Sequence, residues 1–263
     1  MSAILLLTAT AFEQQSIVDQ LTEPVRYSLS GRQVSRGRLR GRPVWVLEGG
    51  LGAVNTAHAL TVALQTNRPE LVLQIGVGGA YATAALAVGD LVIATEENYG
   101  DLGVRTPEGW QSADAIGIPV LQVPGPQGGE ERYFNRFPLE ENLVTSAGEA
   151  LGERAWADEQ PGLAAGPFVT VQECSGTAQL GSERAELFSG ALCENMEGAA
   201  AAHICRLYAT PFLEVRAISN QVEDRRRETW DLPLAAAEAG LPMSEFLAGL
   251  KKSPRLSRTL AAL

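Results

Sequence analysis

Three polar residues stand at positions where their side chains could act on a bound molecule. Glu13 follows a short apolar run, Glu197 precedes an alanine-rich stretch, and Asn220 follows the apolar run 212–218. A carboxylate can take up a proton or accept hydrogen bonds, and an amide can donate two. Each residue also has a structural explanation, as an acid in a first helical turn, as a partner of a helix dipole, or as a cap. Their combination predicts a functional site.

Two glycine clusters could bring the backbone close to a ligand. The first, Gly50-Leu51-Gly52, follows an apolar run and opens a helix, where N–H groups can meet an anion or a sugar. A dinucleotide motif is weak here because Asn55 replaces its third glycine. The second cluster, Gly76-Val77-Gly78-Gly79, follows the next apolar run. Either cluster could be a compact turn only, but two close approaches at strand ends are typical of ligand sites in open α/β sheets.

Short apolar runs bounded by glycine predict strands that are buried on both faces of a central sheet. They are Ile4–Leu7, Val44–Leu47, Leu71–Ile75, Leu91–Ala94, Phe168–Val171 and Phe212–Ile218. Helices are predicted at Ala53–Gln65, Gly198–Tyr208 and Ala235–Leu250. This alternation indicates an α/β protein, and we expect one domain over residues 1–263. The Gly- and Pro-rich stretch 106–140 is interpreted as an excursion from the sheet.

Composition excludes several classes of function. The chain has 31 acidic and 21 basic residues, a net charge of −10, so we expect no nucleic-acid partner and a small-molecule ligand instead. The arginine-rich run 32–42 is interpreted as the solvated face of a hairpin, and Arg225-Arg226-Arg227 as a surface loop. His58 and His203 are too few for a histidine metal site, and we expect neither a metal nor another cofactor.

Localisation is predicted from the same sequence. The apolar N-terminus has no basic residue before it, so it is interpreted as a first strand and not as a signal peptide. The apolar stretch 71–94 is interrupted by glycines and by Asp90, which argues against a membrane span. Cys174, Cys193 and Cys205 form no even disulfide set, so we expect reduced thiols in a cytoplasmic protein.

Five separated motifs resemble the purine nucleoside phosphorylase and nucleosidase superfamily, in order and at matching distances over residues 1 to about 250. They are Gly50-x-Gly52, Gly76-x-Gly78-Gly79, Val88-Gly89-Asp90-Leu91-Val92, Asn195-Met196-Glu197-Gly198-Ala199-Ala200-Ala201 and Val215-Arg216-Ala217-Ile218-Ser219-Asn220. The resemblance implies a single-domain, three-layer α/β fold with a central mixed sheet flanked by helices, and a homo-oligomer. Within the superfamily, the chain most resembles the futalosine hydrolases, which release hypoxanthine from futalosine in menaquinone biosynthesis.

The resemblance implies a role for each residue near the sugar. Cleavage of an N-glycosidic bond passes through a ribosyl cation, so the site must stabilise positive charge and deliver a nucleophile. Glu197 matches the acceptor of the ribose 2′ and 3′ hydroxyls, and Met196 an uncharged wall beneath the sugar. Glu13 matches the general base for the attacking water. Arg216 matches an arginine that holds this water and keeps Glu13 ionised.

Asn220 is the departure from the methylthioadenosine and adenosylhomocysteine nucleosidases, which carry an aspartate there. Its NH₂ group has two donors, and a 6-oxopurine presents two acceptors, N7 and O6, so asparagine selects hypoxanthine-type bases. Val77, Gly78 and Cys174 are expected to contact the substrate as well. The loop around Cys174 matches a base-lining loop of the family but lacks its usual aromatic residue.

Three alternatives stay open. The chain could be a methylthioadenosine/adenosylhomocysteine-type or other purine nucleosidase, or a phosphorylase, or a nucleoside-binding protein without catalysis. Phosphorolysis is disfavoured because 8–12 holds no basic residue and Val77 replaces the Ser or Thr of the phosphorylases. An arginine is expected for the benzoate-like carboxylate of futalosine, and Arg105, Arg132 and Arg184 are all candidates.

Overall fold

A computed structural model describes residues 3–125, 128–152 and 162–249. Its strands are β1 (Ile4–Thr8), β2 (Thr22–Leu29), β3 (Arg32–Leu39), β4 (Arg42–Glu48), β5 (Leu71–Ala80), β6 (Leu91–Tyr99), β7 (Gly103–Thr106), β8 (Gly109–Ser112), β9 (Leu121–Pro124), β10 (Glu130–Tyr133), β11 (Arg136–Pro138), β12 (Leu163–Thr170), β13 (Cys193–Asn195) and β14 (Phe212–Gln221). Its helices are α1 (Ala11–Val18), α2 (Ala53–Thr66), α3 (Glu141–Gly152), α4 (Ala178–Leu187), α5 (Gly198–Leu207) and α6 (Leu232–Gly249). All six predicted strands and all three predicted helices are present; Leu250 lies outside the described residues.

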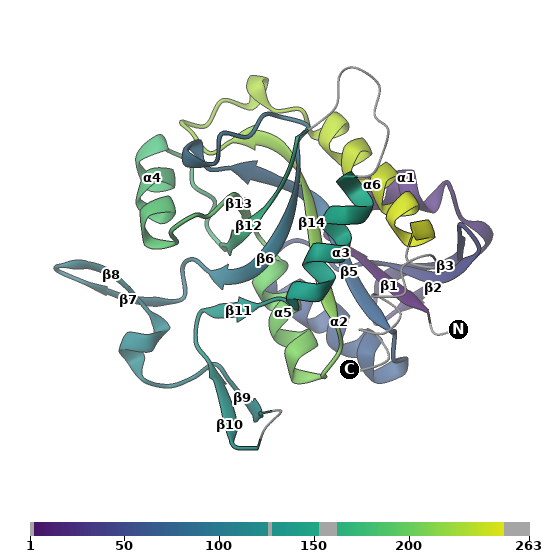
Figure 1. Cartoon of the computed structure of the whole chain (residues 1–263), viewed down its shortest axis with the longest axis horizontal. Helices are drawn as coiled ribbons and strands as arrows, with labels where there is room; N and C mark the ends of the chain where they lie inside the picture. Colours follow the sequence, from purple (N-terminus) through teal and green to yellow (C-terminus); the bar gives the residue numbers. More distant parts are fainter. Residues whose placement is uncertain (1–2, 126–127, 153–161, 250–263) are drawn as a thin grey trace.

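The main sheet is mixed, as the resemblance implied. β1 pairs in parallel with β4 and β5, and β14 pairs in parallel with β5. β14 also pairs antiparallel with β6, which continues through β12 and β13 back to β5. β5, β14, β6, β12 and β13 therefore form a closed circuit; β1, β4, β3 and β2 extend from β5, and β11 pairs with β6 (Figure 1). This circuit can enclose side chains that neither helix layer reaches.

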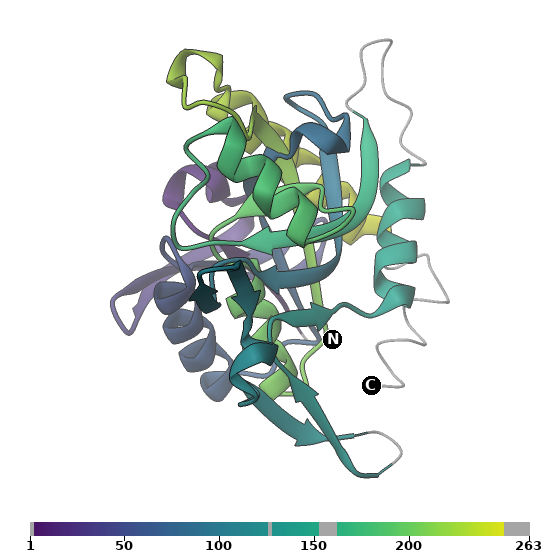
Figure 2. The same ribbon diagram turned by 90° about the vertical axis from the view of Figure 1, so that its left-hand side faces the viewer.

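Helices cover both faces of the sheet because both faces are apolar. In β1, Ile4 and Leu6 pack in one core with α1, α3 and α6, while Leu5 and Leu7 pack in another with α2 and α5. Alternate residues of a strand point to opposite faces, so one short apolar run serves two cores. The result is a helix–sheet–helix arrangement of three layers (Figures 1 and 2).

The excursion predicted at 106–140 contains two hairpins, β7–β8 and β9–β10, that project from the body (Figure 1). The arginine-rich run forms β3 and the turn after it, and Arg36, Arg38 and Arg40 are exposed as expected. Arg32 differs, since its side chain is half-buried and bonds Asn55 at the start of α2. Arg42, at the start of β4, differs as well, since its side chain is 12% exposed and pairs with Glu70. The prediction of a purely solvated face is wrong at these two residues.

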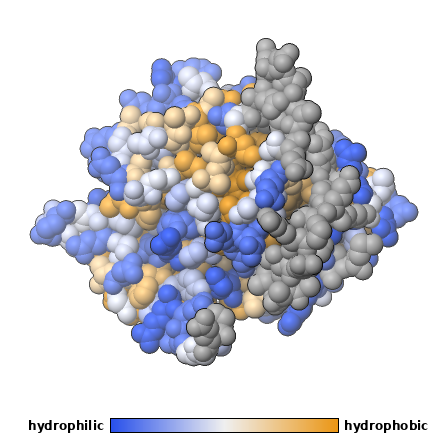
Figure 3. Space-filling model, viewed as in Figure 1, coloured by the Kyte–Doolittle hydropathy of each residue, from blue (hydrophilic) through white to orange (hydrophobic). Residues whose placement is uncertain are grey.

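None of the helices within the described residues is long and apolar enough to cross a bilayer. Figure 3 shows hydrophilic residues around the rim of one face and a hydrophobic area above its centre.

Candidate active site

A cavity of about 430 Å³ opens beside the ends of β1, β5 and β14. Strands that lie side by side bring distant parts of the chain to this edge, as expected for a parallel region. All eight residues that the sequence predicts for the site line it: Glu13, Val77, Gly78, Cys174, Met196, Glu197, Arg216 and Asn220. The structure therefore brings the whole predicted set together.

Glu13 is held at the start of α1 by the local sequence. The Thr10 side chain caps the helix by accepting from the Glu13 N–H, and Glu13 Oε2 accepts from the Thr10 N–H at 2.9 Å. Its other oxygen, Oε1, accepts from the Val77 N–H at 3.1 Å. Glu13 therefore has both proposed roles: its carboxylate caps the first turn of α1, and it also lines the cavity.

Burial and neighbouring charges act on Glu13 in opposite directions. Burial raises the pKa of Glu13 above its usual range, while the charge of Arg216 and the Val77 N–H act in the opposite direction. The sequence predicted that Arg216 keeps Glu13 ionised; its effect has that sign, but burial outweighs it. Gly76 makes room for the approach, since a Cβ there would lie 2.5 Å from Glu13 Oε1 and 3.1 Å from Arg216 Nη1.

Glu197 is buried, and the first glycine cluster supports it. Gly52 has a φ of +84°, which glycine adopts without strain, and its N–H donates to Glu197 Oε1 at 3.0 Å. The other oxygen, Oε2, accepts from Arg216 Nη2 at 3.1 Å. The Gly50-x-Gly52 turn therefore binds a carboxylate of the protein, and in this way it positions Glu197 in the cavity wall.

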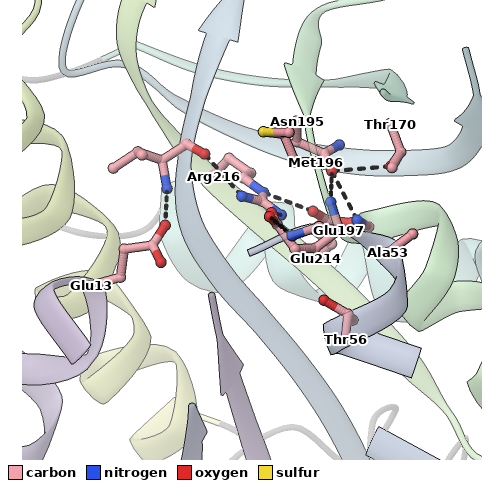
Figure 4. Close-up of polar contacts among 12 residues, drawn as sticks. Glu13, Ala53, Thr56, Thr170, Asn195, Met196, Glu197, Glu214 and Arg216 are labelled. Atoms are coloured by element: carbon pink, nitrogen blue, oxygen red, sulfur yellow. Dashed lines mark hydrogen bonds and ion pairs between the residues drawn. The ribbon is translucent and has the colours of Figure 1, made fainter. Parts of the chain in front are cut away.

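Arg216 is the centre of the polar network. Nε donates to Glu214 Oε1 at 2.8 Å, Nη1 to the Val77 carbonyl at 2.9 Å, and Nη2 to Glu197. Burial disfavours its charge, yet Glu214, Glu197 and Glu13 together raise the pKa of the guanidinium above its usual range. Figure 4 shows Arg216 between Glu13 on one side and Glu197 and Glu214 on the other. The charged arginine thus bonds Glu197 directly and acts on Glu13 through its charge.

Asn220 lies within β14, which continues to Gln221 past the end that the sequence predicted. The pairing with β5 is irregular between Ile218 and Asn220, and this irregularity redirects the side chain. Asn220 Oδ1 accepts from the Ser219 hydroxyl at 2.8 Å, and Nδ2 donates to the Gln221 carbonyl at 2.9 Å. One N–H of the amide therefore remains for a ligand, where the sequence predicted two.

The loop around Cys174 is fixed by a buried network that the sequence did not reveal. Glu194 accepts from the Ser175 N–H at 2.7 Å and its hydroxyl at 2.6 Å, and also from Tyr81 and Arg184. Cys174 Sγ lies 3.4 Å from Met196 Sδ, so this loop closes over the Met196 side of the cavity. Glu194 carried no sequence signal beyond its position three residues before Glu197.

The arginines proposed for the substrate carboxylate lie elsewhere. Arg184 is buried against Glu194, and Arg105 and Arg132 lie on the projecting hairpins, none of them lining the cavity. Arg225 lines it instead, with its guanidinium 4.6 Å from the centre of the Trp230 ring. Trp230 gives the cavity an aromatic side chain, although the Cys174 loop has none. The sequence did not predict Trp230 as a site residue. Among the described residues, no group of His, Cys, Asp and Glu could hold a metal ion.

Comparison with known proteins identifies the family. The profile of the phosphorylase superfamily matches residues 3–247. The chain belongs to this superfamily. It is 32% identical over 219 residues to a futalosine hydrolase of Thermus thermophilus, covering 82% of this chain and 88% of that protein. It is 29% identical over 244 residues to a 5′-methylthioadenosine/S-adenosylhomocysteine nucleosidase of Actinobacillus succinogenes, covering 91% and 89%.

Solved structures agree on the fold of this superfamily member. A 5′-methylthioadenosine/S-adenosylhomocysteine nucleosidase of Neisseria meningitidis, in complex with methylthio-immucillin-A, superposes with a TM-score of 0.79 at 24% identity. It covers 95% of this chain and 100% of its own. The predicted α/β fold with a central mixed sheet is confirmed, and so is the expectation of an enzyme whose relatives are nucleosidases.

Proposed function

We propose that this enzyme hydrolyses the N-glycosidic bond of futalosine, releasing hypoxanthine and dehypoxanthine futalosine. The observation that carries the choice of base is the amide of Asn220. Ser219 donates to its oxygen, so its nitrogen is the atom that can meet the base, and this nitrogen keeps one free N–H. N7 and O6 of a 6-oxopurine are both acceptors, so this N–H serves either of them as negative charge builds on the leaving base. The futalosine hydrolase relative agrees with this choice.

Glu13 and Arg216 are proposed to deliver the water. Glu13 and Arg216 both line the cavity and approach each other beside Gly76, so a water in the cavity can give a hydrogen bond to the carboxylate and receive one from the guanidinium. The raised pKa of Glu13 makes it a stronger base, one that takes the water proton as the oxygen attacks the sugar carbon. The hydroxyl joins C1′, the base departs with its bonding electron pair, and the proton taken up by Glu13 then passes through water to the departed base, which restores the carboxylate.

Glu197 and Met196 are proposed to hold the sugar. Glu197 is fixed from behind by Gly52 and Arg216, and it retains lone pairs that can accept from the ribose hydroxyls. Its negative charge stabilises the ribosyl cation, which exists only near the transition state, so it accelerates the reaction beyond any effect on binding. Met196 lines the cavity as an apolar, polarizable surface beside the sugar.

Arg225 and Trp230 are proposed to bind the benzoate-like end of the substrate. Arg225 is exposed at the cavity and has no carboxylate partner within the described part of the chain. A guanidinium can pair with the carboxylate, and the Trp230 ring offers an aromatic surface. We also propose a homo-oligomer in the cytoplasm and one domain over the whole chain, in keeping with the superfamily resemblance.

A second candidate is a nucleosidase for 5′-methylthioadenosine or S-adenosylhomocysteine, because relatives with that name reach 29% identity over 91% of this chain. One experiment separates the two. Release of the base is measured with futalosine, aminodeoxyfutalosine, inosine and adenosylhomocysteine, each with and without phosphate. We expect the largest kcat/KM with futalosine. A larger value with adenosylhomocysteine would assign the second candidate.

A further inference from the structure

Two glutamates are completely buried behind the cavity. Glu97 lies on β6 and Glu214 on β14, each with 0% exposure, and neither lines the cavity. Burying one carboxylate is costly and burying two near each other is more so, unless charge and hydrogen bonds compensate. The motifs that predicted the site include neither residue, so their contacts must explain their presence.

Each glutamate holds a different part of the active site. Glu214 Oε1 accepts from Arg216 Nε at 2.8 Å. Glu97 accepts from Asn195 Nδ2 at 2.7 Å and from the Thr170 hydroxyl at 2.6 Å. Asn195 Oδ1 in turn accepts from the Glu197 N–H at 2.9 Å. Glu214 therefore supports Arg216, and Glu97 supports the turn that carries Glu197.

The two carboxyl groups meet each other above Gly198. A Cβ at Gly198 would collide with Glu97 Oε1 and with Glu214 Oε2 at once, so only glycine leaves room for both. Glu214 Oε2 has no N–H or hydroxyl donor among the described residues, and the group that interacts with it is the Glu97 carboxyl group. Two ionised carboxylates cannot occupy such a dry contact together, so one of them holds a proton.

The proton belongs to Glu97. Burial, and then the charge of Glu214, raise the pKa of Glu97 well above its usual range, although Thr170 and Arg216 act in the opposite direction. Glu214 is paired with a guanidinium, which favours its negative charge. The other titratable groups that face Glu97 are the Cys193 thiol and the Tyr99 hydroxyl; burial raises the pKa of both, so neither adds a charge beside Glu97.

We propose that Glu97, protonated, and Glu214, ionised, form a proton-sharing pair that positions Arg216 against Glu197. Both are positioning residues, since neither touches the substrate. With Glu97 neutral, the positive charge of Arg216 balances one of the two carboxylates that it contacts, and one negative charge remains for the sugar side of Glu197. This consequence for catalysis rests on the proposed nucleosidase reaction; the shared proton itself does not.

The test compares two isosteric variants. In Glu97→Gln an amide N–H can replace the proton toward Glu214, but the amide nitrogen cannot accept from Asn195 Nδ2 as Oε1 does. We therefore expect kcat at pH 7 to fall by about tenfold, the cost of one mispaired donor. In Glu214→Gln the guanidinium loses its charged partner, and we expect kcat to fall on the order of 10²-fold with a smaller change in KM. Glu96→Gln is the matched control on β6, because Glu96 pairs with Arg136 away from the cavity; its kcat should not change.

Infrared spectroscopy at neutral pH gives a readout that needs no substrate. The wild type and Glu96→Gln should show the C=O stretch of a buried protonated carboxyl group, and Glu97→Gln should lack it. If the band is absent from the wild type or remains in Glu97→Gln, the shared proton is refuted. If Glu97→Gln loses as much kcat as Glu214→Gln while it stays folded, the division of roles is refuted. Failure of the futalosine assignment alone would change the substrate used and leave the band unaffected.

Discussion

Replacing Asn220 with aspartate tests how the enzyme chooses its base, because the change affects a single atom. In the wild type, the two hydrogens of Nδ2 have separate uses: one is donated to the Gln221 carbonyl at 2.9 Å and the other faces the cavity. Oδ1 accepts from Ser219 in both proteins. In Asn220→Asp the nitrogen becomes an oxygen, which carries one hydrogen if protonated and none if ionised.

The size of the effect follows from counting these hydrogens. A protonated aspartate can satisfy the Gln221 carbonyl or a 6-oxopurine, but not both, and an ionised one opposes acceptors on either side. Each buried polar group left without a partner costs about 1–3 kcal/mol, and each 1.4 kcal/mol is about a factor of ten. The one acceptor left unpaired in the complex costs up to about 3 kcal/mol, which predicts a loss of kcat/KM on futalosine of up to about 10²-fold. An adenine-type base can donate its 6-amino group to the new oxygen, so aminodeoxyfutalosine should lose much less.

The assay measures kcat/KM for futalosine and for aminodeoxyfutalosine with wild type and variant. The two substrates differ only at position 6, so losses from folding or from sugar contacts cancel in the ratio. We expect the ratio of futalosine to aminodeoxyfutalosine cleavage to fall by up to about 10²-fold in the variant. An unchanged ratio would show that Asn220 does not contact the base, and the reasoning about its donors would be refuted.

Four further predictions concern the rest of the site. Glu13→Gln keeps the shape of the side chain without the base, so turnover should fall about 10²–10⁴-fold with little change in affinity. In the wild type, kcat should decline as the pH falls through the raised pKa of Glu13, since the protonated acid cannot act as a base. Glu197→Gln removes the charge that faces the ribosyl cation, so turnover should fall more than the affinity for hypoxanthine, measured by titration calorimetry; equal losses would make Glu197 structural. Arg225→Gln should raise KM for futalosine by about fivefold, the value of an exposed ion pair of about 1 kcal/mol, and leave KM for inosine unchanged, since inosine has no carboxylate; an equal rise for both would place Arg225 at the base. Added phosphate should not raise the rate, and the sugar product should carry no phosphate when analysed by mass spectrometry.

The sequence predicted the strands and helices that carry their own signal. The run Ile4–Leu7 is apolar at every position because both faces of β1 are buried, and a short continuous run bounded by polar residues indicates such a strand. The short strands β7 to β11 lie in a Gly- and Pro-rich stretch with exposed residues on most of their length, so no periodicity marks them. The closed circuit of strands was not predicted, because the pairing of β14 with both β5 and β6 depends on contacts distant in sequence.

The site was predicted as a set of residues but not as a network. The sequence indicates Glu13, Glu197 and Asn220 because each lies next to the end of a predicted strand or helix. Asn220 donates to the Gln221 carbonyl where the pairing of β14 with β5 is irregular. No residue type in the sequence predicts this irregularity. Glu97 lies in the pair Glu96-Glu97, where nothing in the sequence distinguishes the exposed ion pair from the fully buried acid.

The distribution of charge around the cavity argues for water as the nucleophile. A phosphate dianion needs cations that are free to pair with it. Arg216 is already donated to Glu214, Glu197 and the Val77 carbonyl, and any anion beside it would also meet Glu13. A bound phosphate would therefore add negative charge beside Glu13 and Glu197, and the three anions would repel one another. A neutral water is not repelled by these carboxylates. In the proposed reaction the same two groups favour hydrolysis, because Glu13 takes up the proton and Glu197 stabilises the cation.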